Sequence, residues 1–595
     1  MFLIFSPDKQ FWKKNVNYIF AGQWCTSLKY ISKNREKLRY LKYHWSNQNK
    51  FDNDVIKLDE IYEKYLTCLF KELNSIHSIK YSKNYWRIII GPWLKSFIDT
   101  LYDRFLFIKT ASKDKTINQT WITSEKLSPE FLGHNFNHNS TNDILFSEIL
   151  RFTNLIPYAE KNIIPNETKE NSSVSFLRHF KKSPILLARQ IYYVVLDRVL
   201  PQFFYFMNND IAIGGDIFLN RIDRIKLQLK CKSFFSIING KKVSPKYEYD
   251  LNLRKKINLL ESNDIFNKLL NKLLVESLPT VFLENYKFYN EIVLKNTPSK
   301  AKICYTAEHF HYIYFFKFWS AYQIETNNMK LIQIQHGGNY CTYKHKFFDK
   351  HILDCAYKYI TWGASLSNSK AKKMPSLRLH KFINKIKFND NFGSIMWVHT
   401  GVAKYTTTAE NQYVGINMMN YFKDQKLFYS ILNNNVKKLL ISRHFINTWE
   451  DTKRIKEFAP NIKLQIVRKS EKLGKKNNFF LDLKLSRISI HTANQTTFLE
   501  TLSANYPTLI FWDPNLNQIR DEQKYLFDIL IDAEILHLNP KTAALKLNSV
   551  YNDIESWWNS KKVQKARNLF CTELAYTNSD YLNIWKKEIQ QELKM

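Results

Sequence analysis

Short apolar runs that end in glycine- or threonine-containing turns recur through the second half of the chain. They occupy residues 330–335, 359–363, 394–399, 438–442, 463–467, 488–491 and 507–512. Polar or helix-forming sequence separates them, and strands that alternate with helices predict parallel sheets. Two such blocks lie on either side of the charged segment 367–390. The sequence therefore predicts an α/β fold with two Rossmann-like domains that face a cleft, where ligands bind at the carboxyl ends of the strands.

The first third of the chain has a different, helical pattern. Residues 58–73 place Ile61, Tyr65, Leu69 and Leu73 at helical spacing, and residues 86–107 and 184–200 are also predicted helices. The polar, Asn-rich residues 135–173 are predicted to form a loop. We expect residues 1–380 to form the first domain, helical at first and then α/β. Residues 381–595 form the second, which is expected to begin near Phe388.

The chain is strongly basic and too long for a single hydrophobic core. It has 595 residues and a formal net charge of +34, from 88 Lys and Arg against 54 Asp and Glu. The basic residues are spread along the chain, whereas a nucleic-acid footprint normally clusters. We therefore expect an anionic membrane surface and phosphate-rich substrates as partners, and no nucleic acid. A compositional bias toward Lys, Asn and Ile is the alternative.

The cysteines and the amino terminus bear on location. The seven cysteines include no CxxC pair, which favours free thiols in a reducing compartment over a zinc site. Residues 1–12 carry an acid at Asp8 and no small-residue cleavage site, so no signal peptide is predicted. We expect a cytoplasmic protein, peripheral at the inner face of the cytoplasmic membrane.

Residues 488–520 carry the strongest site pattern, a strand, turn, helix and second strand. His491 and Thr492 end the first strand, and Thr496 and Thr497 begin the helix. The free N–H groups and positive dipole at a helix start suit a phosphate, and Glu500, one turn later, could accept hydrogen bonds from ribose hydroxyls. The alternative is an ordinary helix cap with a solvated glutamate.

A second pattern follows the strand at residues 330–335. His336 stands at the strand end, and Gly337 and Gly338 permit a tight turn with close backbone approach. A histidine there can act as a base near neutral pH, although a structural role is the alternative. The turn Thr361-Trp362-Gly363 is expected beside it if the two strands are neighbours.

Three further patterns carry less information. Arg443 follows a strand and could hold a phosphate with two hydrogen bonds, or it could be one more surface arginine. Gly401 is a candidate turn near the phosphates. Residues 308–311 (EHFH) lack metal-binding spacing, so a helix cap or core edge is predicted. The sequence has no GxGxxG, no GxxxxGK[ST] and no GxSxG, which gives no support to dinucleotide oxidoreductases, P-loop enzymes or α/β-hydrolases.

Taken in order, these and other short motifs resemble a family of transferases encoded in bacterial O-antigen and capsule loci. The amino-terminal marks are residues 18–25 (YIFAGQWC), 84–94 (NYWRIIIGPWL) and 102–104 (YDR). Later marks are residues 278–279 (LP), 283–284 (LE), 335–340 (QHGGNY), 361–363 (TWG), 491–492 (HT), 497–500 (TFLE), 507–508 (PT), 511–514 (FWDP) and 557–558 (WW). The sequence departs from the family at Cys341, where a glycine is expected, and at Ala364, where an aromatic residue is expected.

The resemblance implies a glycosyltransferase-B fold that binds acceptor with its amino-terminal half and nucleotide sugar with its carboxyl-terminal half. The arrangement of the chain is also similar to that of the polyol-phosphate polymerases of wall teichoic acid, which carry a comparable His-Gly turn. We expect transfer of a sugar from a nucleotide-activated donor to a lipid-linked or oligosaccharide acceptor of a growing surface glycan. His336 would be the base, Arg443 and residues 491–497 would hold the phosphates, and Glu500 the ribose. No metal or cofactor is expected.

Two alternatives stay open at this point. A polyol-phosphate transferase would use the same anion-binding turn, so the sequence hardly separates it from a glycosyltransferase. A non-enzymatic, basic nucleic-acid-binding protein is the other, and it predicts salt-sensitive binding to RNA or DNA.

Overall fold

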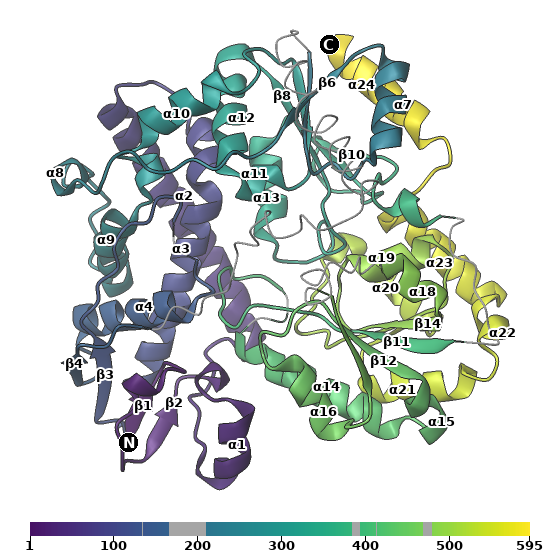
Figure 1. Ribbon diagram of the computed structural model, residues 1–595, viewed down its shortest axis with the longest axis horizontal. Coiled ribbons are helices and arrows are strands. Elements are labelled where there is room, and N and C mark those ends of the chain that lie inside the picture. Colours follow the sequence, from purple (N-terminus) through teal and green to yellow (C-terminus); the bar gives the residue numbers. More distant parts are fainter. Residues whose placement is uncertain are drawn as a thin grey trace, which may run out of the picture.

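The structure is a computed structural model that describes residues 1–133, 135–165, 210–383, 393–411, 413, 415–467 and 479–594. The predicted helix at residues 184–200 lies outside these ranges. The described residues form three all-parallel sheets, one in an amino-terminal region and one in each of two α/β domains. Figure 1 shows the two α/β domains one above the other, with the long amino-terminal helices beside them.

Two long helices dominate the amino-terminal region. The predicted helices are confirmed within α2 (Gln48–His77) and α3 (Lys83–Ala111), which pack against each other. Beside them lies a sheet in the order β2-β1-β3-β4. Its strands are β1 (Phe2–Ile4), β2 (Tyr18–Phe20), β3 (Gln119–Thr123) and β4 (Tyr158–Lys161). The loop predicted for residues 135–173 is wrong where α4 (Asn139–Thr153) forms, because Leu145, Phe146 and Ile149 bury one face of that helix.

The first α/β domain has a six-stranded sheet in the order β10-β9-β8-β7-β5-β6. The strands are β5 (Ile211–Gly214), β6 (Phe235–Ile238), β7 (Ile303–Thr306), β8 (Lys330–Ile334), β9 (Lys358–Thr361) and β10 (Ala371–Lys373). Strands are added to one side of β5 (β6) and then to its other side (β7 onward), so the switch point of this parallel sheet lies between β5 and β7. Ligands of such sheets bind at the switch point. Strand β10 lies within residues 367–390, so part of the predicted connection belongs to the sheet.

Helices cover both faces of this sheet. Alternate strand residues join two different hydrophobic clusters, as expected when side chains point to opposite faces. Helices α10 (Tyr286–Lys295) and α12 (Tyr314–Asn327) cover one face. Helices α7 (Arg221–Cys231) and α24 (Tyr581–Lys594) cover the other.

Helix α24 departs from the predicted division at residues 380 and 381, which placed everything to residue 595 in the second domain. Its Tyr581, Trp585 and Ile589 fill the core of the first sheet, and α24 lies beside α7 in Figure 1. Glu588 and Glu592 form ion pairs with Lys358 on β9. The apolar stripe of this helix therefore belongs to the core of the first sheet.

The second α/β domain has a six-stranded sheet in the order β13-β12-β11-β14-β15-β16. The five strands predicted after residue 390 are confirmed as β11 (Ser394–Val398), β12 (Leu440–His444), β13 (Lys463–Ile466), β14 (Ser486–His491) and β15 (Thr508–Phe511). Strand β16 (Leu536–His537) completes the sheet. Counted within the domain, this is the Rossmann order 3-2-1-4-5-6, with its switch point between β11 and β14.

Helices also cover this second sheet on both sides. Helices α14 (Met418–Ile431), α16 (Asp451–Phe458) and α21 (Pro540–Val550) pack on one face. Helices α19 (Thr496–Ser503), α20 (Asp521–Asp532) and α23 (Lys561–Leu574) lie on the other. The prediction of two Rossmann-like α/β domains is therefore confirmed. No helix within the described ranges combines the length and apolarity needed to cross a bilayer.

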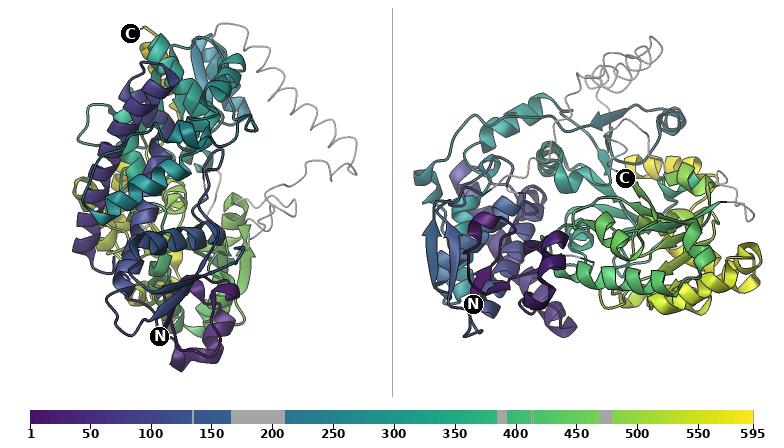
Figure 2. Two further views of the ribbon diagram at one scale, coloured as in Figure 1. Left: turned by 90° about the vertical axis from the view of Figure 1, so that its left-hand side faces the viewer. Right: turned by 60° about the horizontal axis from the view of Figure 1, so that its bottom comes forward.

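The second domain is fastened to the amino-terminal region. Residues 399–411, which we call the docking loop, leave the end of β11 and reach helices α3 and α4. The N–H of Ala409 donates to the Asp99 carboxylate at 2.9 Å, and the Tyr405 hydroxyl bonds to the side chain of Asn139 at 2.9 Å. In the right-hand view of Figure 2 the purple amino-terminal helices lie against the green start of the second domain. The amino-terminal region therefore contacts both halves of the molecule.

Candidate active site

The carboxyl edge of the first sheet carries a histidine and a glutamate side by side. His336 follows β8 and Glu308 follows β7, and His336 Nε2 lies 3.6 Å from Glu308 Oε2. About a quarter of the His336 side chain is exposed, so a substrate can reach it. Burial lowers the pKa of His336 to about 4, and the nearby Arg378 adds to the effect. The imidazole is therefore neutral at pH 7 and able to accept a proton.

Glu308 is held in place by an aspartate from the neighbouring strand. Asp216 follows β5, and its carboxylate accepts hydrogen bonds from the N–H groups of Ala307 (3.1 Å), Glu308 and His309 (2.7 Å). Burial raises the pKa of Glu308, and the charge of Asp216 adds to this. The sequence analysis assigned residues 308–311 to a helix cap and did not single out Asp216, although Gly214-Gly215-Asp216 after an apolar strand is a turn signal.

An arginine links this pair of residues to the second domain. Arg378 Nε donates to Glu500 Oε1 at 3.0 Å, and the guanidinium carbon lies 5.2 Å from the ring centre of Phe218. The Phe218 ring in turn lies 5.4 Å from the ring of His336. Burial raises the pKa of Glu500, and Arg378 opposes that rise. Sequence reasoning missed Arg378 because it lies in the segment taken for an interdomain connection.

The opposite wall of the cleft is the start of α19 at the switch point of the second sheet. Thr496, the first residue of α19, accepts a hydrogen bond from the N–H of Gly338 at 3.0 Å. Gln495, which precedes the helix, makes no side-chain capping bond, but its amide donates to Thr400 beyond the end of β11. The two carboxyl edges thus meet where His336, Glu308 and the α19 N–H groups come together.

Three other residues of the predicted donor turn are engaged inside the second domain. His491 Nδ1 lies 3.1 Å from the Thr497 hydroxyl and its Nε2 lies 2.9 Å from the Ser489 hydroxyl. Thr492 donates to the carbonyl of Val398 at 2.9 Å. Burial, and then the charge of Arg443, lowers the pKa of His491 to about 3. These side chains are therefore committed to contacts within the second domain.

The remaining predicted residues lie at different distances from this point. Arg443 Nε donates to Asp482 at 3.1 Å and its guanidinium lies over the ring of Phe479, so it reaches a phosphate only by sharing or leaving that partner. Gly401 belongs to the docking loop and packs against Ile446. Neither lies in the contact between the two domains that Gly338 and Thr496 make.

The turn Thr361-Trp362-Gly363 lies next to the segment that carries His336. Its Gly363 has a φ of +111°, and an added Cβ would lie 2.9 Å from the backbone of Glu573 at the end of α23. The N–H of Trp362 donates to the Gln335 amide at 2.7 Å, and the same amide donates to the Gly337 carbonyl at 2.9 Å. The turn therefore faces α23 and fixes the His336-Gly337 segment through Gln335.

Sequence comparison gives the family. The model of the LIC12162 family of transferases matches residues 1–589. The chain belongs to this family. The protein is thus a transferase, as the sequence predicted. No curated protein sequence matches it.

Solved structures similar to this transferase share little sequence with it. MurG of Acinetobacter baumannii is 12% identical over 64% of this chain and 99% of that chain, with a TM-score of 0.35. An O-GlcNAc transferase of Thermobaculum terrenum is 7% identical over 92% and 97%, with a TM-score of 0.32. A UDP-GlcNAc 2-epimerase of Neisseria meningitidis is 7% identical over 60% and 97%, with a TM-score of 0.29. At these TM-scores the architecture rests on the sheets and helices described above.

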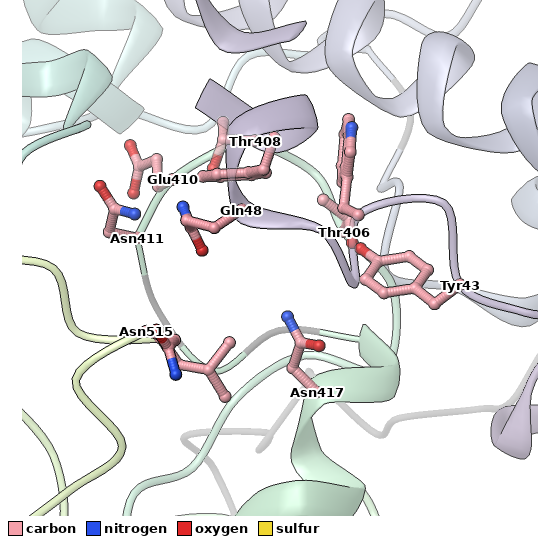
Figure 3. A pocket seen from close by; sticks show the side chains of 11 residues that line it. Tyr43, Gln48, Thr406, Thr408, Glu410, Asn411, Asn417 and Asn515 are labelled. Atoms are coloured by element: carbon pink, nitrogen blue, oxygen red, sulfur yellow. The ribbon is translucent and has the colours of Figure 1, made fainter. Parts of the chain in front are cut away.

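A small polar pocket lies elsewhere on the transferase, between the amino-terminal region and the second domain. Figure 3 shows Gln48 and Asn417 pointing into it from opposite sides, with Glu410 and Asn411 of the docking loop nearby. Its Glu410 is paired with Lys346 at 2.6 Å. The pocket has room for about one or two water molecules, so it suits hydration of the interface better than a substrate.

The close approach at Gly338 gives a first prediction for the transferase. A Cβ added there would lie 2.6 Å from the carbonyl oxygen of Gln495 and 2.9 Å from its carbon, both backbone atoms of the other domain. We expect Gly338→Ala to move the two domains apart, to lower turnover, and to destabilise the protein by about 1–3 kcal/mol, as overpacking does. Gly337→Ala is the control, because its Cβ would lie 3.1 Å from the movable Thr496 hydroxyl. Equal denaturation midpoints for both variants would contradict this account.

Proposed function

We propose that this transferase moves a sugar from a nucleotide-activated donor to a growing bacterial surface polysaccharide or lipopolysaccharide O-antigen. One observation carries the proposal. The carboxyl edges of two Rossmann-like sheets meet at the Gly338–Thr496 hydrogen bond, with His336 and Glu308 on one side and the first turn of α19 on the other. A nucleotide at the second switch point would therefore have its sugar next to His336.

The donor side is built for a phosphate. The N–H groups at the start of α19 and the helix dipole favour an anion there. Because the Thr497 hydroxyl is engaged by His491, we assign phosphate binding to the backbone of this turn. Arg378 would supply positive charge beside the same point, and Glu500, its ion-pair partner, would accept from the ribose. Arg443 would join the phosphates by turning from Asp482.

The acceptor side requires a base. His336 is neutral at pH 7 and takes the proton from the acceptor hydroxyl as its oxygen bonds to the sugar, while the bond between the sugar and the donor phosphate breaks and the nucleotide leaves with that electron pair. A pKa of about 4 makes the free imidazole a weak base, and the Glu308 carboxylate at 3.6 Å would pair with the imidazolium that develops. Asp216 acts as a positioning residue, since it fixes the backbone from which Glu308 projects.

The high positive charge supports a membrane surface as the location of this reaction. A net charge of +34 favours loose association with the anionic inner face of the cytoplasmic membrane, where a lipid-linked or oligosaccharide acceptor would be found. Transfer of a polyol phosphate is the second candidate, favoured by the same anion-binding turn at α19. Release of a nucleoside diphosphate indicates sugar transfer from diphosphate-activated donors, and release of a monophosphate with a phosphorylated product indicates the alternative.

The test of the proposal is protection by nucleotides. We expect one or more nucleotide sugars to raise the thermal midpoint of the purified protein, because a ligand at 100 times its Kd stabilises the folded state by about 2.7 kcal/mol. Glu500→Gln should weaken that protection while keeping the shape of the site. His336→Ala should leave it intact, because His336 acts on the acceptor. If no activated nucleotide protects the protein, or if Glu500→Gln is protected like the parent, the donor site is wrong.

A further inference from the structure

A second pocket opens in the first half of the molecule, on the acceptor side of the cleft. It lies between α3, the loop near Gly133, and the start of α12. Its cavity volume is about 340 Å³, at the lower end of the range of pockets that take small molecules. The walls are largely aromatic, with Trp93, Tyr312 and Phe348 among them. Aromatic faces of this kind suit the apolar face of a sugar ring.

Three polar side chains of this pocket lack a hydrogen-bond or ion-pair partner among the described residues, namely His311, Trp93 and Lys317. Lys317 is 1% exposed and His311 is 2% exposed, and both line the pocket. Within the described residues, neither ring nitrogen of His311 has a hydrogen-bond partner, and neither has the indole N–H of Trp93. The Lys317 ammonium lies 3.9 Å from the centre of the Tyr314 ring, and no ion pair to it is found in the described ranges. Buried donors left without partners are costly, so each calls for an explanation.

The charge of the pocket identifies the kind of group that would satisfy these donors. The described residues that line it include Lys317 and His311 but no aspartate or glutamate. Burial lowers the pKa of Lys317 to about 7, which is the effect of an unpaired buried cation. An oxyanion would accept from the ammonium and from the Trp93 indole and would favour the charged lysine.

The pocket adjoins the candidate catalytic pair. The ring of His311 lies 6.3 Å from the ring of Tyr340, which lies 6.1 Å from the ring of His336. Lys346, whose ammonium lies 5.2 Å from the centre of the Tyr340 ring, is the other cation here, and Glu410 is its ion-pair partner. Tyr340 thus lies between the His311 wall of the pocket and His336.

We propose that this pocket binds an anionic sugar of the acceptor, with Lys317, Trp93 and His311 holding a carboxylate or phosphate oxygen and the aromatic walls holding the ring. The term acceptor rests on the proposed function, but binding of an oxyanion-bearing sugar does not. The two sources of the anion differ in chemistry, a uronic acid or a sugar phosphate, and the test separates them.

The test measures how fast Lys317 reacts with a trace of acetic anhydride at pH 7, followed by mass spectrometry of its peptide. Three probes are compared, namely glucuronic acid, glucose 1-phosphate and neutral methyl glucoside, without any nucleotide. We expect at least one anionic probe to slow Lys317 acetylation at least five-fold at saturation, while methyl glucoside has no effect. The better protector identifies the anion as a carboxylate or a phosphate.

The variants make the result specific. Lys317→Met should weaken calorimetric binding of the protecting probe at least ten-fold, whereas Lys302→Met, which removes an exposed lysine paired with Asp210, should not change it. If Lys317→Met fails to fold, the protection of Lys317 from acetylation in the parent protein decides whether the proposal stands. Equal protection by all three probes, or by none, overturns the proposal. Protection without any sugar transfer refutes the proposed function but leaves the anionic-sugar pocket standing.

Discussion

His336→Ala is expected to lower turnover by roughly two to four powers of ten while leaving the fold intact. In the proposed mechanism the imidazole accepts the acceptor's proton, and the variant removes that base while leaving Glu308 in place. The measurement is kcat with saturating donor and acceptor, beside the thermal midpoint with and without nucleotide. The midpoints should match those of the parent protein.

The pH profile supplies a second readout for the same residue. Because the pKa of His336 is lowered to about 4, kcat/KM should hold as pH falls below 6.5 and be lost as pH falls through about 4, where the base becomes protonated. An exposed histidine would lose activity near pH 6.5. The matched control for turnover is His537→Ala. It removes a buried histidine on β16, at the far edge of the second sheet. Near-normal turnover of His336→Ala would assign His336 a structural role.

Lys95→Met is expected to destabilise the protein by about 3–5 kcal/mol. Lys95 lies inside α3 with 1% of its side chain exposed, and its ammonium pairs with Asp99 at 2.9 Å and Asp59 at 3.0 Å. Burial raises the pKa of Asp99, and Lys95 opposes this rise. Removing the lysine leaves the fully buried Asp99 without its cation, and Asp99 also holds the docking loop through Ala409.

Denaturant unfolding followed by fluorescence measures this loss. The control is Lys302→Met, which removes one member of an exposed ion pair and should cost less than about 1 kcal/mol. Faster proteolysis within the docking loop should accompany the loss in Lys95→Met, because the loop loses a fixed acceptor. If both variants unfold at the same denaturant concentration, the buried pair does not hold the loop.

The sequence predicts the second half of the fold well because its strands are buried on both sides. Such strands appear as continuous apolar runs with a turn at the end, as in β8 and β15. The apolar run and the turn residues then predict the same strand. The amino-terminal sheet gives no such signal, since β1 and β2 have three residues each and β1 pairs with β3 more than 110 residues later. Their pairing is set by packing against α3 and α4, which no local pattern encodes.

The candidate site is predictable only where strand ends mark it. His336, Gly338 and Thr496 follow from strand, turn and helix patterns, and the structure brings them together. Arg378 and Glu308 reach the same point through the tertiary arrangement, one from beyond β10 and one from the turn that Asp216 holds. Hydroxyls such as that of Thr497 look available in sequence but are engaged by buried neighbours.

Because α24 packs on the first sheet, it affects the order in which the two domains complete their folding during synthesis. A ribosome delivers residues 581–594 after every strand of both α/β sheets, yet their Trp585 and Ile589 complete the core of a sheet whose first strand, β5, begins at Ile211. Domains usually fold as units while the chain emerges. Here the first domain must wait, with one face of its sheet partly bare, until residues 581–594 have been synthesised. A chain stopped short by a few tens of residues would lose the closing piece of its earlier domain.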